Sequence, residues 1–301
     1  MHNQHRRWHT PLLVQITAVI VASLLSIQVA VANDAAATPE QTNQTSRLPR
    51  VASINLCADQ LLLEFADPAQ ILSLTNLSHN PSASIHVDKA IHYPVNTGIV
   101  EEILPLQPDL VLAGTFTSSY TLKLLRATGL RVEIIPIANS MSELMAALEQ
   151  AAGWIQQEAK AKPVIAAMRK RLASLPAPLE PLPRAAIYDP RGYTVGRSSL
   201  RGEMLELAGW HNVAADKGIQ SYGTLSLETV LKLDPDVLVE SPYSAGTWSR
   251  AQALNSHPAL RLRGLKADVI TIPSSHTICG GAWSMDVIGK LLAARQALNE
   301  M

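Results

Sequence analysis

Residues 101–112 read EEILPLQPDLVL, and residues 228–239 read ETVLKLDPDVLV. The two stretches align without gaps, so the Pro-Asp pair of one falls on the Pro-Asp pair of the other. Each predicts a helix, a Pro-Asp turn and a strand, because proline ends a helix and a continuous apolar run is typical of a strand buried on both faces. A further strand ending in Ile-Pro follows each stretch, at residues 132–136 and 269–273. One such unit is a common α/β connection, but its repetition predicts two related lobes.

The rest of the chain shows the same alternation of short apolar runs with helical stretches, which is typical of parallel sheets with helical crossovers. Strands are expected at residues 51–54, 71–74, 110–113, 132–135, 184–188, 237–240 and 269–272. Helices are expected at residues 58–65, 100–106, 118–128, 200–208 and 225–233. The fold class is therefore α/β, with two lobes that contain parallel sheets and leave a ligand cleft between them.

A long helical stretch separates the two lobes. Ser140 and Glu143 have the spacing of a capping box, and the helix that they begin runs towards residue 175. Pro163 must kink this helix or restart it. Four prolines then fall within residues 176–183 and predict a stiff linker. We accordingly expect an N-terminal lobe over 50–140, a helical connector and linker over 141–183, and a C-terminal lobe over 184–301.

The N-terminus has the pattern of an export signal. Basic and histidine residues precede an uncharged apolar stretch that closes on a small-residue cleavage pattern at Ala30-Val31-Ala32. An uncleaved membrane anchor is the alternative, but several polar residues dilute the stretch. We therefore expect a signal peptide over 1–32 that is removed on export to the periplasm, followed by a flexible tether over 33–49.

The charge balance excludes a class of function. The chain has 25 basic and 25 acidic residues, and loss of Arg6 and Arg7 with the signal leaves 23 against 25, a net charge of −2. A protein held by nucleic-acid phosphates needs a basic face, so a nucleic-acid partner is not expected. The apolar fraction of 47% is ample for a packed core.

The opening Arg50-Val-Ala-Ser-Ile54, the two helix–Pro-Asp–strand units and the long helix between them resemble the cluster III periplasmic binding proteins. These bind vitamin B12, ferric siderophores or haem for ATP-driven importers. The resemblance covers about residues 50–298 and implies two Rossmann-like lobes joined by a long interdomain helix, with the ligand in the cleft between them. It implies a monomeric binding protein that is not an enzyme and has no cofactor. Such a protein delivers a bulky metal chelate to an ABC importer, which consists of a permease dimer and its ATPase.

The resemblance also implies a docking role for two acidic residues. In the family, one carboxylate on each lobe contacts arginines of the permease, and Glu101 and Glu228 occupy the matching positions, seven residues before the two aligned prolines. Equivalent carboxylates on two related lobes suit a dimeric partner. The alternative is that each is simply a favourable carboxylate in the first turn of a helix.

Ligand-binding candidates lie in the loops that leave the strands, where the scarce aromatic residues are concentrated, while the expected strands and helices are filled with aliphatic residues. Flat rings would suit a macrocycle, and by loose alignment Tyr222 falls where B12-binding relatives place a stacking tryptophan. The candidates are Asn55, Cys57, His79, Thr115, Tyr120, Arg191, Tyr193, Tyr222, Tyr243, Trp248, His276, Cys279 and Trp283.

Cys57 and Cys279 fall in expected cleft loops, one in each lobe. A disulfide between them would clamp the lobes, but it requires Cα atoms within about 7 Å, which an open cleft does not guarantee. The second interpretation makes them soft ligands for a metal, together with His79 and His276. The third leaves them as ordinary small residues in turns.

The remaining chemistry favours binding over catalysis. The histidines lack metal-site spacing, so no resident metal is expected, and motifs such as G-x-S-x-G and the phosphate loop are absent from the sequence. The alternative enzyme is a periplasmic thiol-dependent hydrolase that uses Cys57 with His79 and Asp59. Few arginines lie near the expected cleft loops, which favours a neutral chelate such as a corrinoid over an anionic ferric siderophore. They are Arg191, Arg197, Arg201 and Arg250.

Overall fold

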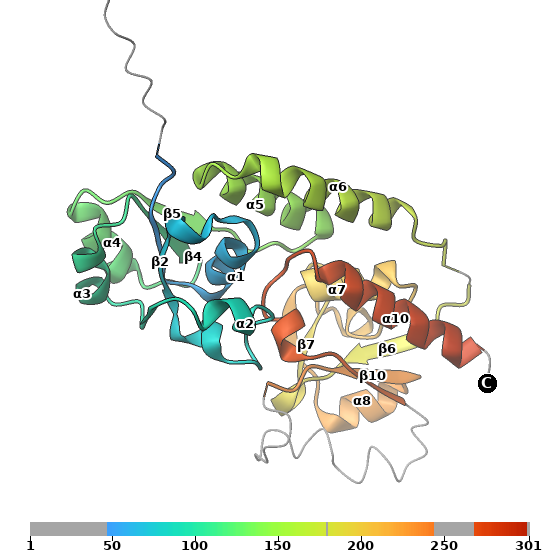
Figure 1. Cartoon of the computed structure of the whole chain (residues 1–301). Helices are drawn as coiled ribbons and strands as arrows, with labels where there is room; N and C mark the ends of the chain where they lie inside the picture. The colour runs from blue at the N-terminus through green and yellow to red at the C-terminus, as the bar shows by residue number, and fades with distance from the viewer. Residues whose placement is uncertain (1–46, 179, 244–267, 300–301) are drawn as a thin grey trace, which may run out of the picture. The chain divides into compact units, whose positions relative to one another are not determined.

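Five parallel strands form the sheet of the N-terminal lobe, in the order β3-β2-β1-β4-β5. This lobe lies at the left of Figure 1, where β2, β4 and β5 are labelled. The central strands β1 and β4 are buried along their whole length, as their continuous apolar sequences predict. In the computed structural model, which describes residues 47–178, 180–243 and 268–299, the strands are β1 (Val51–Ser53), β2 (Ile71–Thr75), β3 (Val95–Asn96), β4 (Leu110–Gly114) and β5 (Val132–Ile135). The helices of this lobe are α1 (Leu56–Phe65), α2 (Val87–Ala90), α3 (Val100–Ile103) and α4 (Ser119–Ala127).

The C-terminal lobe repeats this plan with a sheet of four parallel strands in the order β11-β10-β6-β8. In the same lobe, β7 and β9 pair with each other as a separate antiparallel ribbon. This ribbon carries side chains of the candidate site. The strands are β6 (Arg184–Ile187), β7 (Tyr193–Val195), β8 (His211–Asn212), β9 (Tyr222–Thr224), β10 (Val237–Glu240) and β11 (Asp268–Thr271). The helices are α7 (Leu200–Leu207), α8 (Leu227–Leu233) and α10 (Ser284–Asn299).

The repeated Pro-Asp turns have the same backbone conformation in both lobes. The residue before each proline is left-handed, with φ of 47° at Gln107 and 46° at Asp234. This conformation suits the position, because the residue before a proline is disfavoured in the right-handed helical region. This residue caps the 3-10 turn Leu104–Leu106 that follows α3 in one lobe and the helix Leu227–Leu233 in the other, and the next strand can begin directly after the turn.

The aspartate of each turn holds the central strand beside it. Asp109 Oδ2 accepts a hydrogen bond from the backbone N–H of Arg50 at 2.8 Å, and Asp236 Oδ2 accepts one from Arg184 at 2.7 Å. The same two arginines donate through Nη2 to leucine carbonyls before the turn, at 3.3 Å and 3.1 Å. The repeat seen in the sequence is thus a repeat of hydrogen bonds, and the expected pair of related α/β lobes is confirmed.

The connector between the lobes differs from the single long helix expected. It is a pair of helices, α5 (Met141–Trp154) and α6 (Glu158–Ala173), which pack against each other above both lobes in Figure 1. The break falls at Gln156, whose φ is 58°. Pro163 does not restart the connector at a first turn, because it lies in the second turn of α6.

Polar contacts tie α6 to both lobes. Near its start, Lys160 Nζ donates to the carbonyl of Ala66 at 3.2 Å, and near its end, Arg171 pairs with Asp286 of α10 at 2.8 Å. At the start of α5, Ser140 Oγ accepts from the Glu143 N–H at 3.1 Å, as a capping box requires. The reciprocal bond is shifted by one residue, since the Glu143 carboxylate accepts from Asn139 instead, at 2.7 Å.

Several elements were not expected from the sequence. The short strands β3, β7, β8 and β9 have two or three residues each, too few to show a hydrophobic period. The C-terminal helix α10 does carry a helical signal, because Met285, Ile288 and Leu291 recur at three-residue spacing and are buried. The predicted signal peptide of 1–32 and all of the tether before residue 47 lie outside the described residues. Among the described helices, none combines the length and apolar character needed to span a bilayer.

A disulfide joins Cys57, in the first turn of α1, to Cys279, which follows β11 in the other lobe. The Cα atoms are 5.3 Å apart although 222 residues separate them in sequence. The sulfurs are therefore neither metal ligands nor free thiols, and the two other interpretations of the cysteines are wrong. The bond lies in a small buried cluster with Leu56 and Trp283.

Removing this disulfide is predicted to destabilise the protein strongly. A cross-link that closes a loop of this length restricts the unfolded chain by about 5 kcal/mol in the chain-entropy account. We expect the Cys57→Ser, Cys279→Ser variant to unfold at a clearly lower urea concentration than the oxidised protein. Dithiothreitol should shift the wild-type midpoint towards that of the variant and leave the variant unchanged. Equal midpoints in all four samples would contradict the prediction.

Asp59 of α1 is a fully buried carboxyl that fixes the end of β2. Its two oxygens accept the Thr75 N–H at 3.1 Å each, and Oδ2 also accepts the Thr75 hydroxyl at 2.5 Å. Desolvation by burial outweighs these bonds and raises the pKa of Asp59 from 3.8 to about 7. The native state therefore retains this proton over a range in which the unfolded chain loses it.

The raised pKa predicts a stability that falls with pH. Between about pH 4 and pH 7 the native state binds more protons at Asp59 than the unfolded state, so the free energy of unfolding decreases as pH rises and levels off above about pH 7. Asp59→Asn should remove this component, which is on the order of 4 kcal/mol. Urea unfolding at pH 4, 6 and 8 tests it. A difference between variant and wild type that is the same at all three values would refute the assignment.

Candidate functional site

A cavity of about 930 Å³ lies between the lobes, bounded by residues from both sheets and from α5. Much of its lining lies at or beyond the carboxyl ends of the parallel strands: residues 54–57 after β1, 114–116 at the end of β4, 135–138 at the end of β5, and Asp189 and Ser241 after β6 and β10. Carboxyl ends of parallel strands are where open α/β folds bind their ligands. This cavity is therefore the candidate site.

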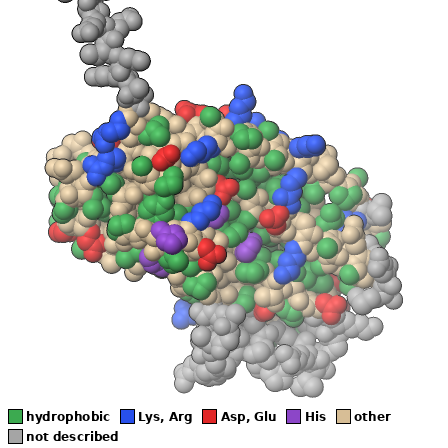
Figure 2. Space-filling view, in the orientation of Figure 1, with side chains coloured by type: hydrophobic (Ala, Val, Ile, Leu, Met, Phe, Trp, Pro, Cys, Tyr) green, Lys and Arg blue, Asp and Glu red, His purple; other side chains and the backbone are tan. Residues whose placement is uncertain are grey.

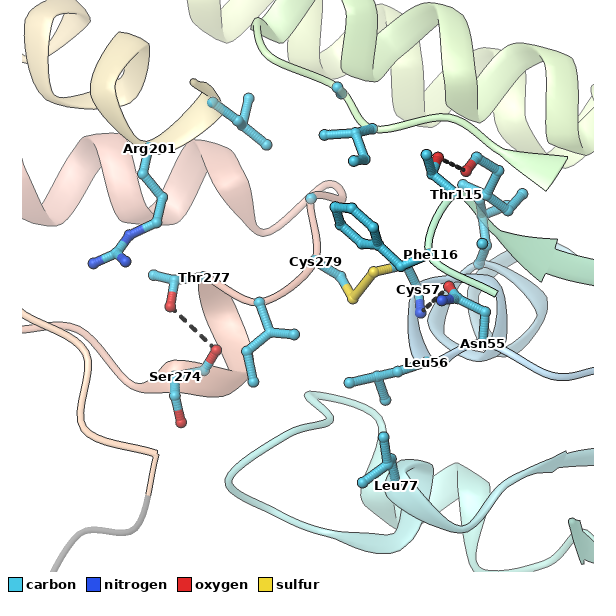
Figure 3. A pocket seen from close by; sticks show the side chains of 18 of the residues that line it. Asn55, Leu56, Cys57, Leu77, Thr115, Phe116, Arg201, Ser274, Thr277 and Cys279 are labelled. Atoms are coloured by element: carbon cyan, nitrogen blue, oxygen red, sulfur yellow. Dashed lines mark hydrogen bonds between the residues drawn. A yellow bond between two sulfur atoms is a disulfide. The ribbon is translucent and has the colours of Figure 1, made fainter. Parts of the chain in front are cut away.

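The N-terminal wall and the α5 side of the cavity are mainly apolar. Leu56, Leu77 and Phe116 line it from the N-terminal lobe, as Figure 3 shows, and Leu144 and Leu148 line it from α5. The Phe116 side chain is 88% exposed although it is aromatic. An exposed ring at the edge of an apolar cavity is typical of a surface that a ligand covers.

Asn55 is a polar residue of this wall, and hydrogen bonds from the backbone of α1 fix the position of its side chain. It is the N-cap of α1, and its Oδ1 accepts the Cys57 N–H at 2.9 Å and the Ala58 N–H at 3.3 Å. A Cβ added at Gly114 would lie 2.2 Å from Asn55 Nδ2, so only glycine allows β4 to approach so closely. The amide is thus held at the cavity edge, next to the disulfide (Figure 3).

Two tyrosines on the β7–β9 ribbon present their rings to the cavity from the C-terminal lobe. Tyr193 pairs with Thr224 and Tyr222 with Val195, so the two tyrosines are diagonal neighbours on one face. Their ring centroids are 6.3 Å apart with an interplanar angle of 23°. Burial, more than the neighbouring groups, raises the pKa of the Tyr193 phenol, which therefore stays protonated. The ribbon forms a flat aromatic surface that is partly exposed.

The charged groups of the cavity are paired with each other. Arg201, in the first turn of α7, donates through Nη1 to Asp189 Oδ2 at 2.5 Å and through Nη2 to Ser241 Oγ at 3.1 Å. Asp189 Oδ1 accepts the Ser241 N–H at 2.8 Å. Among the described lining residues, Arg201 and Asp189 are the only ones that carry full charges. Their pairing leaves the described lining with no net charge.

The structure brings seven of the sequence-derived candidates to this cavity and leaves others elsewhere. The seven are Asn55, Cys57, Thr115, Tyr193, Tyr222, Tyr243 and Cys279. Those that do not line it are His79, Tyr120, Arg191, His276 and Trp283. Trp248 lies outside the described residues, as does Arg250.

The candidates that do not line the cavity lie in other parts of the two lobes. His79 Nε2 bonds to the carbonyl of Ala90 at 2.9 Å, and Trp283 is buried with its indole N–H on the carbonyl of Cys279 at 3.1 Å. Tyr120 lies on α4 with 70% of its surface exposed. Arg191 is left-handed, with φ of 66°, in the turn before β7. His276 lies in the short helix after β11, where burial is the main cause that lowers its pKa.

The sequence interpretation missed the ionic pair and the contribution of α5. From the sequence, Arg201 is one of several arginines near the expected loops, and Asp189 is not among the candidates. The available signal was Ser199, which caps α7 by accepting the Gly202 N–H at 3.1 Å and so places Arg201 in the first turn. The start of a helix that follows a strand is a common place for a binding residue.

The alternative interpretation, a thiol-dependent hydrolase that uses Cys57, is wrong because it requires a free thiol. Cys57 is in a disulfide and offers no thiol, His79 bonds to a backbone carbonyl and Asp59 is held by Thr75. In the parts of the chain that the structure describes, no group of three or more histidine, cysteine, aspartate or glutamate side chains could hold a metal ion.

Glu101 and Glu228 lie at equivalent exposed positions, in the first turns of α3 and α8. Glu228 pairs with Lys232 one turn later, at 2.8 Å, which lowers the pKa of Glu228. Glu102 beside Glu101 instead binds the Thr97 N–H at 2.6 Å. On the face seen in Figure 2, acidic and basic side chains of the described residues are interspersed rather than gathered in one field of charge.

Comparison with known proteins agrees with this architecture. The chain is 31% identical over 196 residues to a cobalamin-binding protein of Halobacterium salinarum, an alignment that covers 63% of this chain and 53% of the relative. It thus spans about half the length of this curated relative. It is also 25% identical over 220 residues to the uncharacterised ABC transporter substrate-binding lipoprotein YvrC of Bacillus subtilis, covering 67% of this chain and 68% of that protein.

Solved structures show the same fold. The periplasmic haem-binding protein HutB of Vibrio cholerae superimposes with a TM-score of 0.67 at 20% identity, covering 81% of this chain and 98% of that one. A periplasmic haem-binding protein of Pseudomonas aeruginosa gives a TM-score of 0.65 at 19% identity, covering 82% and 93%. Residues 51–274 match the family described as periplasmic binding proteins. The chain belongs to the periplasmic binding protein family.

Proposed function

We propose that this protein is an exported substrate-binding protein that captures an uncharged, bulky metal chelate of the corrinoid class and delivers it to an ABC importer. The observation that carries the proposal is the interlobe cavity of about 930 Å³, which combines apolar walls, exposed rings and a neutralised ion pair. Sites that are mostly apolar with a few convergent polar groups bind small molecules without chemistry. The protein's role is capture and release.

Charge distinguishes among the possible chelates. An anionic ferric siderophore requires unpaired basic groups, whereas the one arginine of the described lining, Arg201, is already paired with Asp189. A haem bound through its iron requires an axial ligand such as histidine, methionine, cysteine thiolate or tyrosinate. The described lining contains neither histidine nor methionine, and its two cysteines are joined in a disulfide. Its remaining candidate ligands are Tyr193, Tyr222 and Tyr243, and burial raises the pKa of the Tyr193 phenol. A corrinoid brings its own axial ligands and mainly amide side chains, and the Halobacterium relative is named for cobalamin binding.

The proposed delivery step uses the two lobes as a docking face. Glu101 and Glu228 are exposed at equivalent positions on α3 and α8, which suits basic groups on the two subunits of a permease dimer. The predicted signal peptide over residues 1–32 would bring the mature chain, as a monomer, to the periplasmic side of that importer. We propose no bound cofactor and no nucleic-acid partner.

Calorimetry tests the cargo. Cyanocobalamin should bind with one-to-one stoichiometry, and haem and an anionic ferric siderophore should bind more weakly. Tyr222→Ala should weaken cyanocobalamin binding about tenfold, because a stacking ring is lost. Tyr120→Ala is the matched control, since this tyrosine is also exposed but lies away from the cavity. Tighter binding of haem than of cyanocobalamin, or equal losses in the two variants, would overturn the assignment.

Transport tests the docking face. Glu101→Ala combined with Glu228→Ala should abolish cargo uptake through the cognate importer reconstituted in liposomes, while calorimetric affinity for the cargo stays unchanged. The control is Glu149→Ala with Glu158→Ala, which removes two exposed carboxylates of the connector helices. Undiminished uptake by the first variant, or equal loss in both, would exclude a specific docking role.

A further inference from the structure

An ion pair is partly buried inside the cavity wall of the C-terminal lobe. The side chain of Arg201 is 17% exposed and that of Asp189 is 10% exposed. Arg201 comes from the first turn of α7, and Asp189 lies two residues after the end of β6 at Ile187. Both residues line the cavity, and Figure 3 shows the Arg201 side chain extending from its helix on the same side as Thr277.

Several hydrogen bonds fix the geometry of the ion pair. Arg201 Nη1 and Nη2 donate to the two carboxylate oxygens of Asp189 at 2.5 Å and 3.4 Å, and Nη2 also donates to Ser241 Oγ at 3.1 Å. Asp189 Oδ1 in turn accepts the Ser241 N–H at 2.8 Å. Three of the five guanidinium N–H groups thus have partners in the described part of the chain, which leaves two donors on a group that lines the cavity.

Asp189 determines the sign of the field that a ligand meets. Arg201 and Asp189 are the only fully charged groups among the described lining residues, so the lining carries no net charge with both present and +1 with Arg201 alone. A ligand carboxylate near Arg201 would also lie near the Asp189 carboxylate and would gain little net attraction, because its attraction to Arg201 and its repulsion from Asp189 at similar distances nearly cancel. A neutral carbonyl can accept from the remaining guanidinium donors without that repulsion.

We propose that Asp189 is a specificity-determining residue: by neutralising Arg201 within the cavity, it makes the site select chelates with uncharged amide-type acceptors over chelates with carboxylates. This inference rests on the proposed function and deepens it, because it assigns the charge class of the cargo to one side chain. It predicts that loss of the Asp189 charge converts the same wall into an anion-preferring surface.

The main test compares two ligands that differ by one charge. They are cyanocobalamin and its derivative in which one side-chain carboxamide is hydrolysed to a carboxylate. The wild type should prefer the neutral form by about tenfold or more, and Asp189→Asn, which is close in shape, should erase or reverse that preference. Arg201→Gln should instead strengthen discrimination against the carboxylate, because Asp189 is then unpaired. Asp286→Asn, which breaks the exposed pair with Arg171 outside the cavity, should behave as wild type.

A second test does not depend on the corrinoid. Inorganic phosphate should raise the thermal unfolding temperature of Asp189→Asn in a concentration-dependent way and should not do so for the wild type or for Asp189→Asn combined with Arg201→Gln. If the wild type binds no corrinoid, the proposed cargo fails and the phosphate series still decides the role of Asp189. An Asp189→Asn protein that keeps the wild-type preference, or that phosphate does not stabilise, overturns the inference.

Discussion

The disulfide between Cys57 and Cys279 is the constraint on which the geometry of the site depends. It connects the first turn of α1 to the segment after β11, and both half-cystines line the interlobe cavity. The two lobes are therefore joined covalently at the cavity as well as by the helix pair α5–α6. Walls held at two places need little ordering when a ligand arrives, so more of the contact energy is available for affinity.

The sheets could be predicted from the sequence because their signal is local. The run Leu110–Ala113 is continuously apolar and forms a strand that is buried throughout, and the Pro-Asp turn before it marks its start. The break at Gln156 could not be predicted, because a left-handed residue at a chain reversal is usually a glycine and the sequence Ile155-Gln156-Gln157 contains no such mark. The two-residue strand β3 exists only because β2 offers it an edge.

The candidate site was predicted at the level of loops but not of individual side chains. The loops after the strands do line the cavity, since parallel strands bring their carboxyl ends to one edge. Whether a loop side chain turns inward depends on contacts between distant segments. Trp283 turns into the protein because its indole N–H bonds to the Cys279 carbonyl, whereas Phe116 remains 88% exposed. The cysteine pairing likewise depends on the distance between the lobes, which no local pattern encodes.

The two walls of the cavity come from lobes with the same plan but carry different chemistry. The N-terminal wall presents Phe116 and leucines with the amide of Asn55, and the C-terminal wall presents the ribbon tyrosines and the Asp189–Arg201 pair. A disc-shaped molecule with two unlike faces would meet a different environment when turned over. The two walls of the cavity thus differ in chemistry. The cavity should therefore hold such a molecule in one orientation, so that the same face is always presented first on release.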